Sequence, residues 1–307
     1  ASEQRNAALL TKLKDAAQYD IKEILASTDP DVHEMVQAAF AGKRMELFKA
    51  DCKNNAVIFV IVMYVMMMYF SFVTYMFDPT DTSAFQGMVD LLPEGLMAGF
   101  GFDQASTNLT SFVINCYYGF LVFMVPLVYC LLVSHRLVVR MVDNGSFAYL
   151  LMSPLSRRRI IFTKGCFLLA SIAGLFVILT GGGLLVCQIL FGNMLNVHVF
   201  FQVNINACLL TMVVGMICFF YSCYFNESRL STTWSAGINI GFLLIFIMGG
   251  VSEQAEFLKK FTIYSLLDTE RILEGGSTAG VCLLLFVMIV LLFALSIYVF
   301  DRKNLSI

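Results

Sequence analysis

Six long apolar runs constrain the fold of this chain more than any other feature of its sequence. They cover residues 56–77, 111–133, 166–191, 204–225, 234–251 and 280–300. Each run holds 18 to 26 residues, enough at about 1.5 Å per helical residue to cross a hydrocarbon core roughly 30 Å thick. Because a bilayer interior offers no water, the backbone of each run must form its hydrogen bonds within a helix. The sequence therefore predicts an all-α integral membrane protein with six transmembrane helices.

The composition excludes a soluble domain. Of the 307 residues, 59% are hydrophobic and only 14% are charged, which leaves far more apolar surface than a soluble core of this size needs. The fifth run is the shortest, and Gly181, Gly182 and Gly183 interrupt the third. About 55 mostly polar residues precede the first run, so it is not expected to be a cleavable signal peptide.

The N-terminal segment divides at Pro30. Apolar residues recur at helical spacing before this proline and less regularly after it, which predicts two amphipathic helices joined at a corner. The second helix runs into the first span and suits the lipid headgroups, because it carries four basic residues: Lys43, Arg44, Lys49 and Lys53. A small cytosolic helical hairpin is the alternative. Residues 1–54 are thus predicted to form cytosolic and interfacial amphipathic helices, and residues 55–307 the six-span domain.

The distribution of basic residues predicts the orientation. Seventeen of the 20 Lys and Arg residues lie in the N-terminal segment, the loop 134–164, the loop after the fourth run and the tail. The other three are Lys259, Lys260 and Arg271. Basic residues beside spans stay cytoplasmic, so both termini are predicted to be inside. The first outer loop, residues 78–110, holds five Asp or Glu residues and no Lys or Arg.

The six runs contain no ionisable residue well away from their ends. Ion-coupled transporters usually keep such residues inside their spans, because a charge in hydrocarbon is costly and is retained for a task. If the chain is a transporter, its energy therefore comes from elsewhere. The sequence has no GxxxxGK[ST] loop for nucleotide phosphates, and it has no HExxH motif, CxxC pair or clustered His that would indicate a metal site.

A short amphipathic segment lies between the second and third runs, in the loop VDNGSFAYLLMSPLSRRRIIFTK at residues 142–164. Gly145 permits a sharp entry, and Phe147, Leu150 and Leu151 fall on one helical face. Pro154 disfavours helix at the residue before it and ends the segment. The spacing predicts a short docking helix.

Four basic residues follow this segment: Arg157, Arg158, Arg159 and Lys164. We expect them to anchor the chain at the anionic inner leaflet, where each is worth on the order of 1 kcal/mol. The alternative is a loop whose arginines only set the topology, but that leaves the apolar face before them unexplained.

The loop contains, in this order, Asp143, Asn144 and Gly145, the apolar stretch, Ser-Pro, Ser-Arg and Lys164. This order resembles the first cytoplasmic loop of type-2 ATP-binding-cassette (ABC) exporter membrane subunits. Three other segments resemble that family's first outer loop, its loop between spans five and six, and its basic tail: LLPEGLMAGFGF at 91–102, FLKKFTIYSLLDTERILEGG at 257–276, and FDRKNL at 300–305. The resemblance covers roughly residues 45 to 307.

This resemblance implies a multi-pass subunit of the cell's inner (cytoplasmic) membrane that associates with a second membrane subunit, identical or homologous, and with two separate ATPase subunits. ATP and Mg would be bound by those ATPases, and neither a cofactor in this chain nor a nucleic-acid partner is expected. The coupling helix maps to about residues 145–153 and the interfacial helix to about 32–54, while residues 1 to about 30 have no counterpart. The docking residues it implies are Gly145, Ser146, Phe147, Leu150, Leu151 and Pro154.

Subunits of this family pair through their first and fifth spans. Gly237 and Gly241 form a GxxxG pattern in the fifth run, which allows two backbones to approach closely. Packing within one chain is the alternative. Polar and aromatic residues in the spans are candidates for a path taken by an amphipathic substrate: Tyr64, Asn115, Tyr117 and Asn239. More often such residues are paired between neighbouring helices or lie in interfacial belts, which is the alternative.

The interpretation is thus an ATP-driven exporter subunit that is not itself an enzyme, with a peptide, an antibiotic or another amphipathic compound as substrate. A membrane channel, scaffold or passive carrier without an ATPase remains the alternative. An integral-membrane enzyme is less favoured, because no pair of nucleophile and base emerges at the membrane surface.

Overall fold

A computed structural model describes residues 30–77, 108–118, 121–144, 156–251, 257, 262–267, 269–273, 276 and 278–303. Within these residues the chain is helical and contains no strand. The elements are α3 (Pro30–Tyr75), α6 (Leu109–Tyr118), α7 (Leu121–Leu137), α8 (Val139–Asp143), α10 (Arg157–Phe191), η2 (Gly192–Met194), α11 (Val197–Tyr224), α12 (Ser228–Val251), η4 (Ile263–Leu266), α14 (Thr269–Leu273) and α15 (Ala279–Arg302).

The six predicted spans are confirmed. Six described helices are long and apolar enough to cross a membrane, and five of the apolar runs each coincide with one of them. The second run is divided: residues 111–118 lie in α6, and the spanning helix begins at Leu121 of α7. The 35 residues of α10 extend over about 50 Å, which exceeds a hydrocarbon core of roughly 30 Å. Since the apolar run begins only at residue 166, the excess of α10 lies at its basic first turns.

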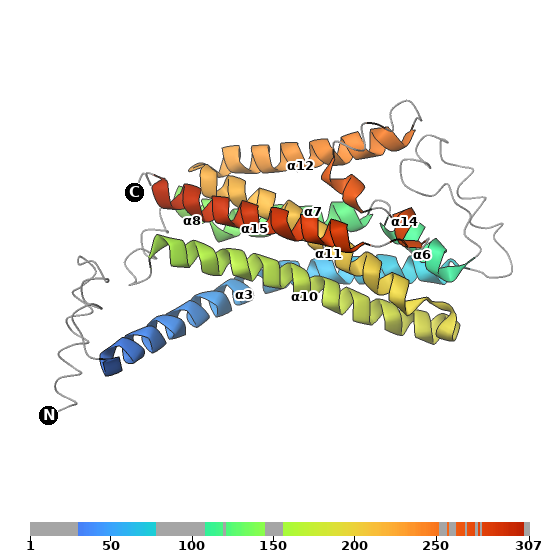
Figure 1. Cartoon of the computed structure of the whole chain (residues 1–307), viewed down its shortest axis with the longest axis horizontal. Helices are drawn as coiled ribbons and strands as arrows, with labels where there is room; N and C mark the ends of the chain where they lie inside the picture. Colours follow the sequence, from blue (N-terminus) through green and yellow to red (C-terminus); the bar gives the residue numbers. More distant parts are fainter. Residues whose placement is uncertain are drawn as a thin grey trace.

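The helices form a bundle around α11, which packs against α7, α10, α12 and α15. Over an apolar stretch of 18 residues in α11, 67% of the residues are buried, whereas 17% are buried over the equivalent stretch of α15. Figure 1 shows α12 and α3 on opposite sides of this bundle, with α10 and α15 running between them. α3 packs along α10 and α7. No other described helix therefore covers the outward faces of α3, α12 and α15.

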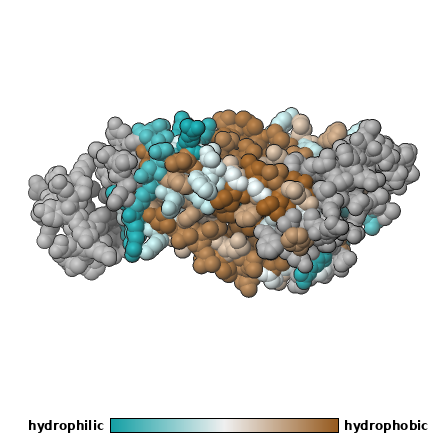
Figure 2. Space-filling model, turned by 90° about the horizontal axis from the view of Figure 1, so that it is seen from above, coloured by the Kyte–Doolittle hydropathy of each residue, from teal (hydrophilic) through white to brown (hydrophobic). Residues whose placement is uncertain are grey.

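The surface carries a hydrophobic belt. Figure 2 shows hydrophobic residues over the middle of the described part and a band of hydrophilic residues near one end, where α10 begins and α15 ends in Figure 1. We call this end the basic end, after Arg157, Arg158, Arg159 and Lys303. A belt of this kind suits a hydrocarbon layer, with the hydrophilic band at its boundary.

The glycine triplet does not interrupt the third span. α10 continues without a break through residues 181–183, and side chains of other helices lie close to two of the three glycines. A Cβ atom on Gly183 would lie 3.0 Å from the rings of both Phe70 and Phe200, and one on Gly182 would collide with Met67. A Cβ on Gly181 would meet nothing within 4 Å. The predicted interruption is therefore a place of close approach between α10, α3 and α11.

α3 begins at Pro30, where the sequence divides. Proline suits the first helical position, since the amide hydrogen it lacks would have no partner within the helix. The helix then continues to Tyr75, so the predicted interfacial segment 32–54 and the first span belong to one helix. The predicted amphipathic helix before Pro30 lies outside the described residues.

Between the fifth and sixth spans, η4 and α14 fold back against the bundle and contact α11. Tyr264 of η4 is 1% exposed, and its ring packs edge-on against Phe123 of α7, with centroids 5.1 Å apart. Phe246 of α12 contacts both rings, at 6.2 Å from that of Tyr264 and 5.9 Å from that of Phe123. This tyrosine attaches the connection to two spans.

Candidate functional site

The predicted docking segment lies between two ordered stems at the basic end. Its six predicted residues, Gly145, Ser146, Phe147, Leu150, Leu151 and Pro154, lie outside the described residues, as does the whole stretch 145–155. The stems are α8 on one side and the first turns of α10 on the other. What can be built from the structure is therefore how this end of the bundle holds the loop.

The first stem, α8, is fixed by burial. Val138 and Val139 are completely buried and Val142 is 8% exposed, in contact with α7 and α12. The backbone N–H of Asn144 donates to the carbonyl oxygen of Arg140 at 3.1 Å, and the helix ends there. The loop therefore begins from a backbone that is anchored in the core.

The second stem starts with three arginines in the first turn of α10, which has no acidic residue. Positive charge at a helix N-terminus is unfavourable, because the helix dipole is positive there. Two contacts with the end of α15 offset this. Arg158 forms an ion pair with Asp301 at 2.6 Å, and Arg157 donates to the backbone oxygen of Lys303 at 3.4 Å. The Arg158 side chain is 71% exposed, so solvent and salt screen the ion pair and it contributes little to stability.

Lys164 lies in a different environment from the three arginines. Predicted to anchor the chain at the membrane surface, it is instead 1% exposed, and its ammonium lies 3.2 Å from Oδ1 and 3.5 Å from Oδ2 of Asp51. Asp51 belongs to α3 and is itself 9% exposed. The burial is explained by this partner, which compensates the charge inside the protein. Sequence analysis missed Asp51, because 113 residues separate the two and no spacing rule connects them.

Lys303 joins three helices at the basic end. It follows α15, and its ammonium donates to the carbonyl oxygens of Cys223 at 2.9 Å and Phe225 at 2.6 Å, at the end of α11. A cation near unpaired carbonyls at a helix C-terminus is favourable. Burial acts in the opposite direction and lowers the pKa of Lys303 to about 8. Through Lys303 and Asp301, the end of α15 contacts both α11 and the start of α10.

The predicted pairing surface lies on the outside of the chain. Gly237 is exposed and Gly241 half-buried on α12, and a Cβ atom at either position would meet nothing within 4 Å. The GxxxG pattern therefore does not serve close packing against another described helix of the same chain. Gly237 and Gly241, which lack side chains, therefore form a shallow outward surface on α12.

The four residues proposed for a substrate path are not brought together on one surface. Tyr64 is 66% exposed on α3, whereas Asn115, Tyr117 and Asn239 are buried. Tyr117 donates to the backbone oxygen of Met66 at 3.3 Å, and Asn239 donates to that of Ser235 at 2.8 Å. Tyr117 therefore bonds a neighbouring helix, as the packing alternative predicts, whereas the bond of Asn239 lies within α12.

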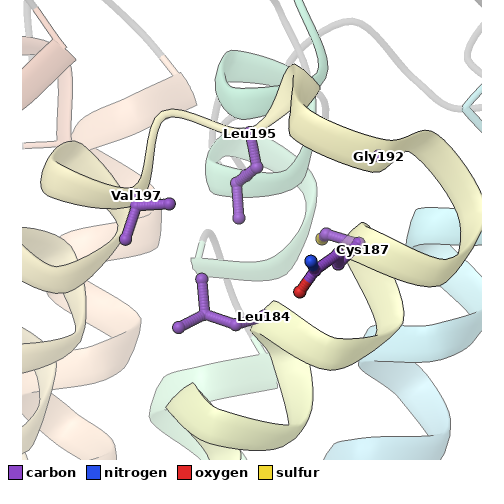
Figure 3. A pocket seen from close by; sticks show the side chains of 6 residues that line it. Leu184, Cys187, Gly192, Leu195 and Val197 are labelled. Atoms are coloured by element: carbon purple, nitrogen blue, oxygen red, sulfur yellow. The ribbon is translucent and has the colours of Figure 1, made fainter.

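A small cavity lies at the opposite end of the bundle from the basic end, where α10 turns through η2 into α11. Figure 3 shows Leu184, Leu195 and Val197 around it, with Cys187 beside them. Its volume is about 240 Å³. Ligand sites usually exceed roughly 300 Å³, so this cavity is small for a substrate.

Among the described residues, no group of three or more His, Cys, Asp or Glu side chains could hold a metal ion. The candidate site is the loop between α8 and α10 at the basic end.

Comparison with known proteins identifies the family. Residues 48–305 match the family model described as ABC-2 family transporter protein. A search of curated proteins finds none that matches the chain. The matched residues include all six spans and both stems of the loop. The chain therefore belongs to the ABC-2 transporter family, as a multi-pass membrane subunit of an ABC transporter whose ATP hydrolysis is carried out by separate ATPase subunits.

Proposed function

We propose that this subunit is the membrane half of an exporter, and that the loop 145–155 is where an ATPase docks. Two membrane subunits, identical or homologous, form the passage and two ATPases bind beneath them, each ATPase holding its own ATP and Mg. Both termini lie in the cytoplasm, and the complex lies in the cytoplasmic membrane. The substrate is an amphipathic compound such as a peptide or an antibiotic.

The observation that carries this proposal is the way the basic end holds the loop. One stem is buried against α7 and α12, and the other is joined by side chains to α3 and α15. A force applied to the loop from outside the membrane therefore reaches several spans at once. The positive charge at this end supports a cytoplasmic orientation, since basic residues flank spans on that side.

The path for substrate follows from the uncovered surfaces. Tyr64 on α3 and the glycine face of α12 both point outward, whereas Tyr117 and Asn239 are buried and donate to backbone oxygens. We therefore place the passage between two membrane subunits, lined by α3 and α12.

The docking assignment is tested by replacing Phe147 and Leu150 together with Glu. Charges on the apolar face of the docking helix should prevent binding to a groove on the ATPase, because a buried unpaired carboxylate is strongly unfavourable. We expect the double variant to insert normally into the membrane but to lose a co-expressed, affinity-tagged ATPase on purification in detergent.

The matched control is Phe147→Leu with Leu150→Met, which keeps the face apolar and should retain the ATPase. If the Glu variant copurifies with ATPase in the same amount as the unchanged chain, the docking assignment is wrong. If the unchanged chain retains no ATPase at all, the exporter proposal fails and a channel, scaffold or passive carrier takes its place.

A further inference from the structure

A charged pair is buried where α3 and α10 cross at the basic end. The ammonium of Lys164 contacts both carboxylate oxygens of Asp51, and the two side chains are 1% and 9% exposed. Two ions taken out of water lose much of their hydration, and apolar residues of similar size often stabilise a fold as well or better. Stability alone therefore gives little reason for this pair.

The surroundings of the pair are tightly packed. One turn before Asp51, Phe48 of α3 meets Phe167 of α10 edge-on, with ring centroids 5.5 Å apart. One turn after it, the amide of Asn55 donates to the backbone oxygen of Asp51 at 2.9 Å. Asn55 therefore bonds the backbone of Asp51, while the carboxylate of Asp51 is held by Lys164.

Lys164 lies two turns from the start of α10, and α10 begins directly after the loop 145–155. On a neighbouring face, the same two turns are joined to α15. Phe162 stacks on Phe293 at 5.4 Å, and Gly165 lies so close to Phe293 that an added Cβ would collide with its ring. Together with Arg158 and Asp301, these contacts attach the first turns of α10 to α15 on one side and to α3 on the other.

An ion pair and an apolar contact respond differently when helices slide. Apolar contacts are non-directional, so one side chain can exchange neighbours at little cost. A buried ammonium that leaves its carboxylate exposes two uncompensated charges to a medium of low dielectric constant. The pair therefore makes α3 follow α10, whereas the phenylalanine contacts around it would permit slippage.

We infer that Asp51 and Lys164 are positioning residues of the transport cycle, which carry the movement of α10 to α3. The inference rests on the proposed function, because the movement of α10 is taken to originate from an ATPase bound at the loop 145–155. Since α3 is also the helix proposed to line the passage, the pair would connect nucleotide binding to opening.

The test measures the movement of α3 directly. Spin labels are attached through non-canonical amino acids at Tyr75 of α3 and Met248 of α12, which are 76% and 60% exposed, so that the nine native cysteines stay in place. The labelled chain is assembled with its ATPase and an excess of unlabelled chain in lipid nanodiscs. Pulsed electron paramagnetic resonance then gives the distance between the labels, without nucleotide and after trapping with ATP and vanadate.

Three variants separate positioning from folding. Asp51→Asn leaves a buried charge and should reduce both stability and movement. The double variant Asp51→Leu with Lys164→Met fills the same space without charge, so it should fold and retain the ATPase yet lose most of the distance change. The exchange Asp51→Lys with Lys164→Asp restores the ionic contact and should restore most of the movement.

The outcomes are distinguishable. If the uncharged double variant shows the full distance change, the pair is merely structural and the inference is overturned. The inference is also overturned if the complex without substitutions at Asp51 and Lys164 shows the same label distance before and after trapping with ATP and vanadate. Failure of the unchanged chain to bind any ATPase would instead overturn the proposed function.

Discussion

At the scale of single residues, Tyr264 combines a favourable ring with an unfavourable hydroxyl. The ring packs against both Phe123 and Phe246, but the buried hydroxyl has no hydrogen-bond partner among the described residues. A buried polar group without a partner costs about 1–3 kcal/mol. We therefore expect Tyr264→Phe to raise the free energy of unfolding by about 1 kcal/mol, measured by thermal unfolding in detergent.

Tyr264→Ala is the companion variant, because it removes the ring as well. Loss of a buried aromatic ring costs about 3–5 kcal/mol, so this change should lower the unfolding temperature markedly. A Tyr264→Phe protein less stable than the unchanged chain would show that the hydroxyl does have a partner, such as a bound water molecule.

Residue-level prediction from sequence failed where partners are distant in the chain. The three arginines after the loop are at the surface or half-buried, as their placement in a basic loop suggests, but Lys164 is buried. No residue near Lys164 in the sequence indicates that Lys164 is buried, since the carboxylate that compensates its charge belongs to Asp51 of α3. For the same reason, the exposed Tyr64 and the buried Tyr117 look equally suitable for a substrate path until the helices are packed.

At the scale of elements, the glycine triplet of α10 offers a comparison between two neighbouring positions. Gly183 faces Phe70 and Phe200, whereas Gly181 faces open space. We expect Gly183→Leu to destabilise the protein by about 1–3 kcal/mol, because a side chain there overpacks the contact with α3 and α11.

Gly181→Leu introduces the same side chain on the outward face and serves as the control. It should be neutral or stabilise by up to about 1 kcal/mol, since glycine is the poorer helix former. Thermal unfolding of both variants in the same detergent checks the difference. Equal stabilities would contradict the assignment of Gly183 to the interior of the bundle.

The existence of the six spans was predictable because only a long apolar helix can cross a bilayer, and long apolar segments are visible in the sequence. Their ends were less predictable. α10 begins nine residues before its apolar run, at Arg157, because Asp301 and the backbone of Lys303 compensate the charge in its first turn. The close approach at Gly182 and Gly183 likewise involves the side chains of other helices, which local sequence does not reveal.

At the scale of the whole molecule, one chain leaves extensive surface uncovered. Large apolar side chains on α3 and α12 are more than half exposed, among them Tyr64, Phe72, Trp234 and Met248. Lipid can cover such surfaces, so exposure alone does not identify an interface. The shallow face formed by Gly237 and Gly241 is more specific, because small residues let two helices approach closely enough for backbone contact.

If two membrane subunits meet at this face, large side chains on it should separate them. We expect Gly237→Trp with Gly241→Trp to insert and to keep the stability of the single chain, since neither position touches another described helix. The pair of subunits should be lost because the backbones can no longer approach. Single-molecule photobleaching of tagged chains in nanodiscs counts the subunits directly. Leu283→Trp with Leu291→Trp, on the exposed face of α15, adds the same bulk elsewhere and should leave the count unchanged. A pair that survives the glycine substitutions would move the interface away from α12, and the proposed passage with it.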